Sequence, residues 1–131
     1  MISFTHFTIE DDSPLYLQIV KHIKHGIIAG TIENQDEMPS RRVLSALVGI
    51  NPNTIQKAYR LLEDEHIIES RSGAKSYICI TPERVSNIRS DMLEGEASAF
   101  ALSMQKMGLS EAEATELIKR VWTKTSKGDQ P

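Results

Sequence analysis

Polar side chains recur at helical spacing near the middle of the chain, at Asn53, Gln56, Lys57 and Arg60. Residues three and four positions apart are neighbours on one side of a helix, so these four would share a polar, cationic face. Asn and Gln amides form paired hydrogen bonds with the edge of adenine, and Arg pairs with guanine or binds phosphate. The pattern therefore favours contact with duplex DNA. The alternative for such cations is a charged surface that contacts only water.

A short helix and a tight turn are predicted to precede this face. Ser40 follows a proline and is expected to cap a helix whose apolar residues Val43, Leu44 and Leu47 face inward. Gly49 then interrupts the helix.

Asn51 and Pro52 predict the start of the next helix, because a capping side chain is followed by proline at the first helical position. Its core stripe is expected at i, i+3, i+4 and i+7, in Ile55, Ala58, Tyr59 and Leu62. The polar face then points outward, and the two helices together predict a helix-turn-helix.

Further elements are predicted on both sides of the helix-turn-helix. Ser13 as a cap and Pro14 as the first helical residue begin an earlier helix that ends at Gly30. Two β-like runs, 67–69 and 77–80, flank a loop that contains Gly73 and two cations, so they predict a hairpin. This order predicts a winged helix-turn-helix with Arg71 and Lys75 at the tip of its wing.

The C-terminal part is predicted to form two helices. Thr81 and Pro82 begin the first, Gly108 ends it, and Ser110 with Glu113 forms a capping box for the second. Two helices cannot cover two wide apolar faces alone, so a second copy of the chain is the simplest cover. The residues expected to pair two subunits are Phe100, Leu102, Met104, Met107, Leu117, Val121 and Trp122.

Composition limits the class of protein. The formal net charge is −3, yet residues 40–77 carry six Lys and Arg against four acids, of which Glu63, Asp64 and Glu65 are expected to be solvated. The single Cys79 excludes internal disulfides and thiolate zinc sites. No apolar run approaches the roughly 20 residues that span a bilayer, and the N-terminus lacks the apolar core of a signal peptide. A reducing cytoplasm is the expected location.

Two other classes of function have less support in the sequence. An enzyme would need a converging nucleophile and base or a metal set, whereas the chain offers four scattered His and no Gly-rich phosphate loop. We therefore expect no catalysis, no cofactor and no metal, although His22 and His25 could form half a metal site. The better alternative is a winged-helix module that binds protein, which would present apolar residues on the outer face of the second helix.

The predicted fold class is α+β and mostly helical. An N-terminal segment (1–12) precedes the winged helix-turn-helix (13–80), which is followed by a two-helix dimerisation region (81–124) and a flexible tail (125–131).

Three sequence motifs resemble the GntR family of bacterial transcription regulators. The longest is Met-Pro-Ser-Arg-Arg-Val-Leu at 38–44, followed by Gly-Ile-Asn-Pro-Asn-Thr-Ile-Gln-Lys-Ala-Tyr at 49–59, a variant typical of its YtrA subfamily. Pro-Leu-Tyr-Leu-Gln-Ile at 14–19 and the wing at 69–73 also match, in the family's order and spacing.

The resemblance implies DNA contacts from Arg42, from the recognition helix and from the wing near Gly73. The chain departs from the family at Pro52, where many members carry Arg, and in the wing, where Ser72 replaces a second Arg. The predicted DNA-binding residues are Ser40, Arg41, Arg42, Asn51, Asn53, Thr54, Gln56, Lys57, Arg60, Arg71, Gly73 and Lys75.

The resemblance also implies a biological role. YtrA-like proteins carry a short helical appendage that pairs two subunits, in place of a large ligand-binding domain. A homodimer that represses from an inverted repeat of double-stranded DNA, near its own promoter and that of a transporter operon, is therefore expected. The sequence does not identify a small-molecule effector, and no membrane partner is expected.

Overall fold

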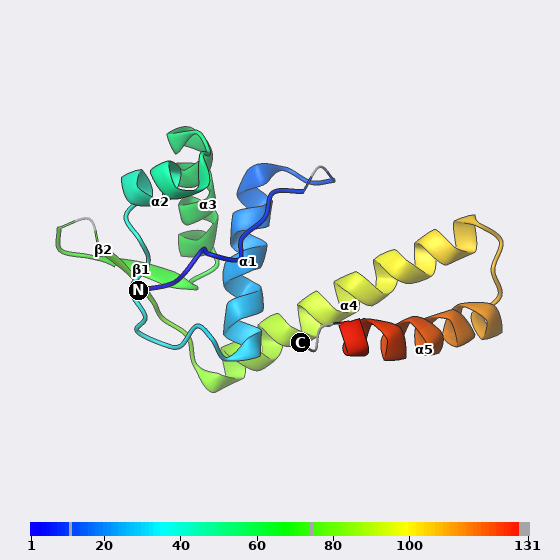
Figure 1. Ribbon diagram of the computed structural model, residues 1–131. Helices are drawn as coiled ribbons and strands as arrows, with labels where there is room; N and C mark the ends of the chain where they lie inside the picture. The colour runs from blue at the N-terminus through cyan, green and yellow to red at the C-terminus, as the bar shows by residue number, and fades with distance from the viewer. Residues whose placement is uncertain (11, 74, 129–131) are drawn as a thin grey trace. The chain divides into compact units, whose positions relative to one another are not determined.

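Five helices and one short hairpin form the chain in the computed structural model, which describes residues 1–10, 12–73 and 75–128. The fold class is therefore α+β and mostly helical, as predicted. One compact unit spans Met1–Arg89 and a second begins at Ser90. Figure 1 shows the elements in order: α1 (Leu15–Ala29), α2 (Arg41–Val48), α3 (Pro52–Asp64), β1 (Ile68–Arg71), β2 (Lys75–Ile78), α4 (Pro82–Lys106) and α5 (Glu111–Gly128).

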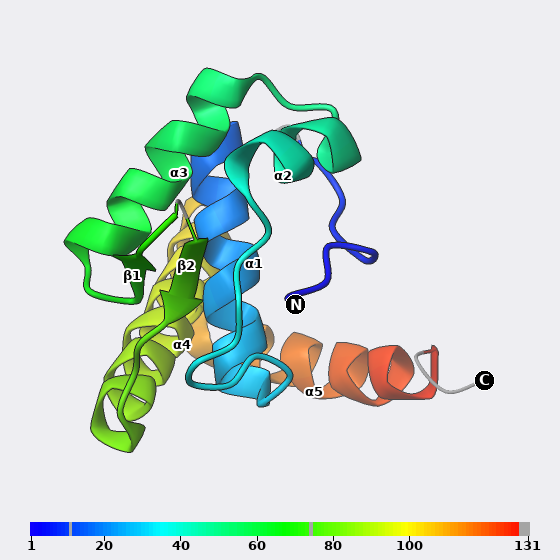
Figure 2. The same cartoon turned by 90° about the vertical axis from the view of Figure 1, so that its left-hand side faces the viewer.

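The core of the first unit forms where α1 and α3 pack together (Figure 2). The predicted stripe of α3 is confirmed, since Ile55, Ala58, Tyr59 and Leu62 are all buried. On α1, the facing residues Ile19, Ile23 and Ile27 are buried at the same helical spacing. Burial of one side of α3 leaves its polar side facing outward.

The inward face of α2 differs from the prediction. Ser40 caps the helix as expected, because its Oγ accepts a hydrogen bond of 3.1 Å from the amide of Val43. Leu44 is fully buried, but Val43 and Leu47 are 48% and 69% exposed, so their predicted burial is wrong. The less exposed positions are 41, 44, 45 and 48, at i, i+3, i+4 and i+7. The stripe therefore begins at Arg41, a charged residue that the apolar pattern could not reveal.

The start of α1 also differs from the prediction. Leu15 is the first helical residue, and no side chain caps the helix, so the predicted roles of Ser13 and Pro14 are wrong. Gln18, which is buried, ties the preceding segment to the helix instead. Its side chain exchanges hydrogen bonds with the backbone of Glu10 (2.8 and 2.7 Å) and donates to the carbonyl of Ser13 (2.7 Å).

The hairpin is antiparallel, with Ile68 opposite Ile78 and Arg71 opposite Lys75. Both strands lie closer to the tip than predicted, and the turn contains Gly73 at φ +77°. Segment 36–38 runs beside β2, since the amide of Met38 donates to the carbonyl of Ser76 (2.9 Å). The base of the wing is therefore fixed to the chain that leads into α2.

The second unit contains most of α4 and all of α5. The predicted boundary at Gly108 is confirmed, because α4 ends at Lys106 and Gly108 has φ +83°. The capping box is also confirmed: the amide of Ser110 donates to Glu113 Oε1 (2.9 Å) and the amide of Glu113 to Ser110 Oγ (3.2 Å). Hydrogen bonding to the Glu113 carboxylate, first from the backbone amide of Ser110 and then from its side chain, holds the pKa of Glu113 below its usual value.

Helix α5 continues to Gly128, through the first part of the segment predicted as a tail, whereas residues 129–131 lie outside the described residues. Across residues 1–10, 12–73 and 75–128, no helix is long and apolar enough to cross a membrane.

Replacing Ser110 with Ala is expected to shorten α5 from its N-terminus, because the amide of Glu113 loses its acceptor, Ser110 Oγ. Loss of such a cap costs about 1 kcal/mol. Circular dichroism during thermal unfolding should show lower helicity and an earlier loss of signal than in the wild type. A matched Ser126→Ala variant, near the other end of α5, should leave both unchanged. Equal curves for Ser110→Ala and the wild type would show that the capping box contributes nothing.

Candidate nucleic-acid interface

The outward face of α3 carries the predicted polar side chains. Asn53, Gln56, Lys57 and Arg60 are exposed, and Thr54 is half-buried beside them. Since the opposite side of the helix is buried in the core, these side chains are held in a fixed register. Amide and guanidinium groups on a rigid helix can read base edges in the major groove.

Two capping residues lie at the helix starts that precede this face. Asn51 Oδ1 accepts a hydrogen bond of 2.8 Å from the backbone amide of Asn53. This cap leaves the side-chain nitrogen of Asn51, Nδ2, as a donor. Ser40 likewise uses an oxygen lone pair for its cap, so its hydroxyl hydrogen can be donated. Both predicted contacts therefore keep a donor while they fix the helix start.

Adjacent arginines at the start of α2 lie in different environments. Arg41 Nη2 forms an ion pair of 3.0 Å with Glu63 Oε1, and its guanidinium lies 4.9 Å from the centroid of the Tyr59 ring. The Arg41 side chain is 30% exposed and ties α2 to α3. Arg42, by contrast, is exposed. Arg42 is thus open to solvent, while Arg41 holds the two helices together.

The acids at the end of α3 were predicted to be solvated, but two of the three form ion pairs. Glu63 pairs with Arg41 on α2, and Glu65 pairs with Lys24 on α1 at 2.9 Å. Asp64 is exposed, in agreement with the prediction. The prediction failed for Glu63 and Glu65 because their cationic partners are distant in the sequence.

Lys57 lies over an aromatic ring of α1. Its Nζ is 4.2 Å from the centroid of the Tyr16 ring, which is close enough for a cation–π interaction. The side chain stays exposed, so its ammonium group is positioned without being removed from water.

The wing presents its two cations differently. The Arg71 guanidinium binds Glu69 Oε1 at 2.9 Å, hydrogen-bonds Gln35 and lies 4.4 Å from the centroid of the Tyr77 ring. Lys75, opposite Arg71 in the hairpin, is exposed. Arg71 is therefore the more engaged of the two wing cations, and Ala74, next to Lys75, lies outside the described residues.

Comparison with known proteins identifies this arrangement. The family model described as "Bacterial regulatory proteins, gntR family" matches residues 15–78, from α1 to the end of β2. The HTH-type transcriptional regulator YhcF of Bacillus subtilis is 30% identical over 110 residues, which cover 84% of this chain and 91% of YhcF. The chain belongs to the GntR family.

Two further relatives assign this GntR protein to the YtrA subfamily. The HTH-type transcriptional repressor YtrA of Bacillus subtilis is 32% identical over 95 residues, 72% of this chain and 68% of YtrA. The solved structure of YtrA from Sulfolobus acidocaldarius has a TM-score of 0.55 and 28% identity, and the match covers 72% of this chain and 99% of that one.

Another solved structure supports the whole architecture. A GntR family transcriptional regulator from Listeria monocytogenes has a TM-score of 0.75 and 31% identity, and the match covers 86% of this chain and 98% of that one. The predicted winged helix-turn-helix is therefore confirmed. The chain is a GntR-family transcriptional regulator with a DNA-binding domain, and it is not an enzyme.

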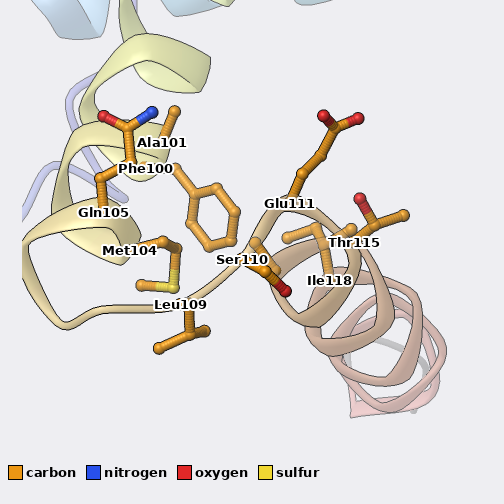
Figure 3. Close-up of a pocket in the computed structure, with 10 residues that line it drawn as sticks. Phe100, Ala101, Met104, Gln105, Leu109, Ser110, Glu111, Thr115 and Ile118 are labelled. Carbon is orange, nitrogen blue, oxygen red and sulfur yellow. The ribbon is translucent and has the colours of Figure 1, made fainter.

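The residues predicted to pair two GntR subunits all lie in the second unit. Phe100, Met104 and Leu117 are half-buried, whereas Leu102, Met107, Val121 and Trp122 are exposed, with Trp122 at 73%. Figure 3 shows Phe100 and Met104 of α4 across from Ile118 of α5. They line a largely apolar groove of about 470 Å³.

Two stabilising contacts of this interface were not found from the sequence. The Arg41–Glu63 ion pair joins two helices, and the apolar pattern of the first did not mark Arg41 as a packing position. The Lys57–Tyr16 contact joins two helices far apart in the chain, and no spacing rule gives their contact.

Proposed function

We propose that this GntR protein is a homodimeric repressor that occupies an inverted-repeat operator in the bacterial cytoplasm. The observation that carries the proposal is the exposed polar face of α3, with Asn53, Gln56 and Arg60 on a helix whose other side is buried. Inserted in the major groove, such a face meets the donors and acceptors that distinguish base pairs.

Each part of the DNA-binding unit takes a separate role in this proposal. Gln56 and Asn53 read base edges, while Arg42 and the Ser40 hydroxyl bind phosphates near the start of α2. Lys75 follows the backbone beside the wing. Phosphate contacts set the register, and α3 supplies the sequence preference.

The apolar second unit supports the homodimer. An exposed Trp122 and Val121 lie on the same helix as Ile118, which lines the groove shown in Figure 3. A second copy would cover these side chains through a two-fold interface, in which the same surface of each subunit takes part. Two recognition helices related by a two-fold axis read two inverted half-sites.

Repression is supported by the relative YtrA, which is described as a transcriptional repressor. We propose that occupancy of the operator excludes the transcription machinery from the promoter of the protein's own operon. A transporter operon is the proposed target, on the resemblance to YtrA-like regulators. The protein-docking alternative predicts apolar side chains on the outer face of α3, and that face is polar and charged.

Titration of the purified full chain against labelled DNA from upstream of its own gene tests this proposal. The same titration on shuffled DNA of equal length, at two salt concentrations, is the control. Binding that is tighter for the upstream DNA and weakens at high salt is expected, because phosphate contacts release counterions. Equal binding to both DNAs would contradict the proposal that the protein regulates its own operon. It would favour the alternative that the winged helix binds protein.

A further inference from the structure

The C-terminal end of the recognition helix α3 is held by cations from two other helices. Glu65, the C-cap residue that directly follows α3, forms an ion pair of 2.9 Å with Lys24 of α1 through its carboxylate. Its backbone carbonyl accepts a hydrogen bond of 2.5 Å from Arg84 Nη2, on the first turns of α4. One residue at the end of the DNA-reading helix is thus shared by α1, α3 and α4.

The contact with Arg84 is favourable on general grounds. The last carbonyls of a helix lack partners within it and carry the negative end of the helix dipole. A guanidinium that donates to such a carbonyl satisfies the hydrogen bond and places a positive charge at the negative end. Arg84 is half-buried, so less water competes for it than for a surface cation.

The start of α4 is itself fixed to the first unit. Thr81 Oγ1 accepts a hydrogen bond of 3.2 Å from the amide of Arg84 and so caps the helix. Ile88, one turn further on, is 4% exposed and belongs to the core of the first unit. The helix then continues without a break to Lys106, well inside the second unit.

We propose that Arg84 is a positioning residue that couples α4, the helix leading to the dimerisation unit, to the recognition helix. By fixing the end of α3 against the start of α4, Arg84 sets the separation and direction of the two recognition helices in a dimer. The inference rests on the proposed reading of an inverted repeat by a homodimer. It makes Arg84 a determinant of half-site spacing, although this side chain contacts no base.

The test compares the full-length Arg84→Ala protein with the wild type on three duplexes. The first is an inverted repeat that the wild type selects from a randomised library. The second carries an insertion of about five base pairs, half a helical turn, between its half-sites. The third holds one half-site. Arg89→Ala, an exposed arginine of the same helix, is the matched control, and Arg84→Lys keeps the charge and N–H donors but not the guanidinium geometry.

Arg84→Ala is expected to bind the selected repeat roughly tenfold more weakly, a typical size for coupling between sites. Its binding to the single half-site should stay unchanged, and the insertion should weaken its binding less than that of the wild type. Arg84→Lys should restore part of the spacing preference, and Arg89→Ala should match the wild type on all three duplexes.

Three results would overturn the inference. Wild-type affinity and spacing preference in Arg84→Ala would show that the contact has no role in positioning. An equal loss on all three duplexes would show that Arg84 supports α3 itself. If Arg84→Ala does not fold, the test rests on Arg84→Lys. Wild-type binding of Arg84→Lys to all three duplexes would show that the hydrogen-bond geometry of the guanidinium does not set the spacing preference. A wild type that binds the repeat no better than the half-site would instead overturn the homodimeric reader on which the inference rests.

Discussion

Truncation after Arg89 is expected to give a folded monomer whose affinity for an inverted repeat is lower by about a hundredfold or more. In a dimer, binding of one half-site makes binding of the second intramolecular, and that gain is lost when the subunits separate. The cut keeps Ile88, which is buried in the first unit, and Arg84, which binds the end of α3. A cut after Ile80 would remove both and confuse loss of pairing with loss of folding.

Analytical ultracentrifugation of the fragment and the full chain checks the pairing, and titration against the selected repeat and a single half-site checks the affinity. The fragment should bind the single half-site as the full chain does. A point variant gives an independent check: Trp122→Asp places a charge on a 73% exposed indole position and should separate the subunits. Lys119→Ala, an exposed residue of the same helix, is the control. A dimeric fragment would contradict the role proposed for the second unit.

Replacing Gln56 with Ala is expected to weaken binding to the selected operator by about 1–3 kcal/mol, the usual cost of a lost base contact. Gln56 is exposed on α3, so the change should leave the thermal midpoint and the dimer intact. Binding to shuffled DNA should be unaffected, because a base contact carries sequence preference and little general affinity. Fluorescence anisotropy with both duplexes measures the two affinities.

The arginine pair at the start of α2 supplies the matched controls for this experiment. Arg42→Ala should weaken binding to all duplexes and lower the salt dependence by about one counterion, as expected for a phosphate contact. Arg41→Ala should instead lower the thermal midpoint, because it removes the ion pair with Glu63 and the contact with Tyr59. Wild-type operator affinity in Gln56→Ala would show that another side chain reads that base pair.

Periodic and capping signals were sufficient to predict most of the first unit. The stripe of α3 could be predicted because four apolar residues at helical spacing leave one consistent inward face, and the Asn51 cap marks where it begins. The Ser110–Glu113 box was equally readable, since both partners lie within one turn. Patterns of this kind can be predicted because the spacing of the residues along one helix determines which of them come into contact.

The errors arose where a contact joins distant segments. Val43 and Leu47 look like core residues by type, but α2 packs through the stripe that Arg41 begins, which leaves both exposed. Gln18 is polar and lies outside the predicted apolar stripe of its helix, yet it is buried because the N-terminal segment folds back onto it. Arg84 carried no signal at all, because the carbonyl of Glu65 becomes its partner only after the hairpin has brought α4 to the end of α3.

The ion pair between Arg41 and Glu63 also bears on how copies of this regulator are distributed in a cell. A guanidinium that already holds a carboxylate of its own chain releases few counterions at a phosphate, and the whole chain carries a net charge of −3. We therefore expect Arg41 to add little to the attraction that exposed cations such as Arg42 and Arg60 exert on DNA of any sequence. A chromosome offers on the order of 10⁶–10⁹ competing sites that sequester a regulator. A cation withheld from this competition lowers the number of molecules that a cell would need to keep one operator filled.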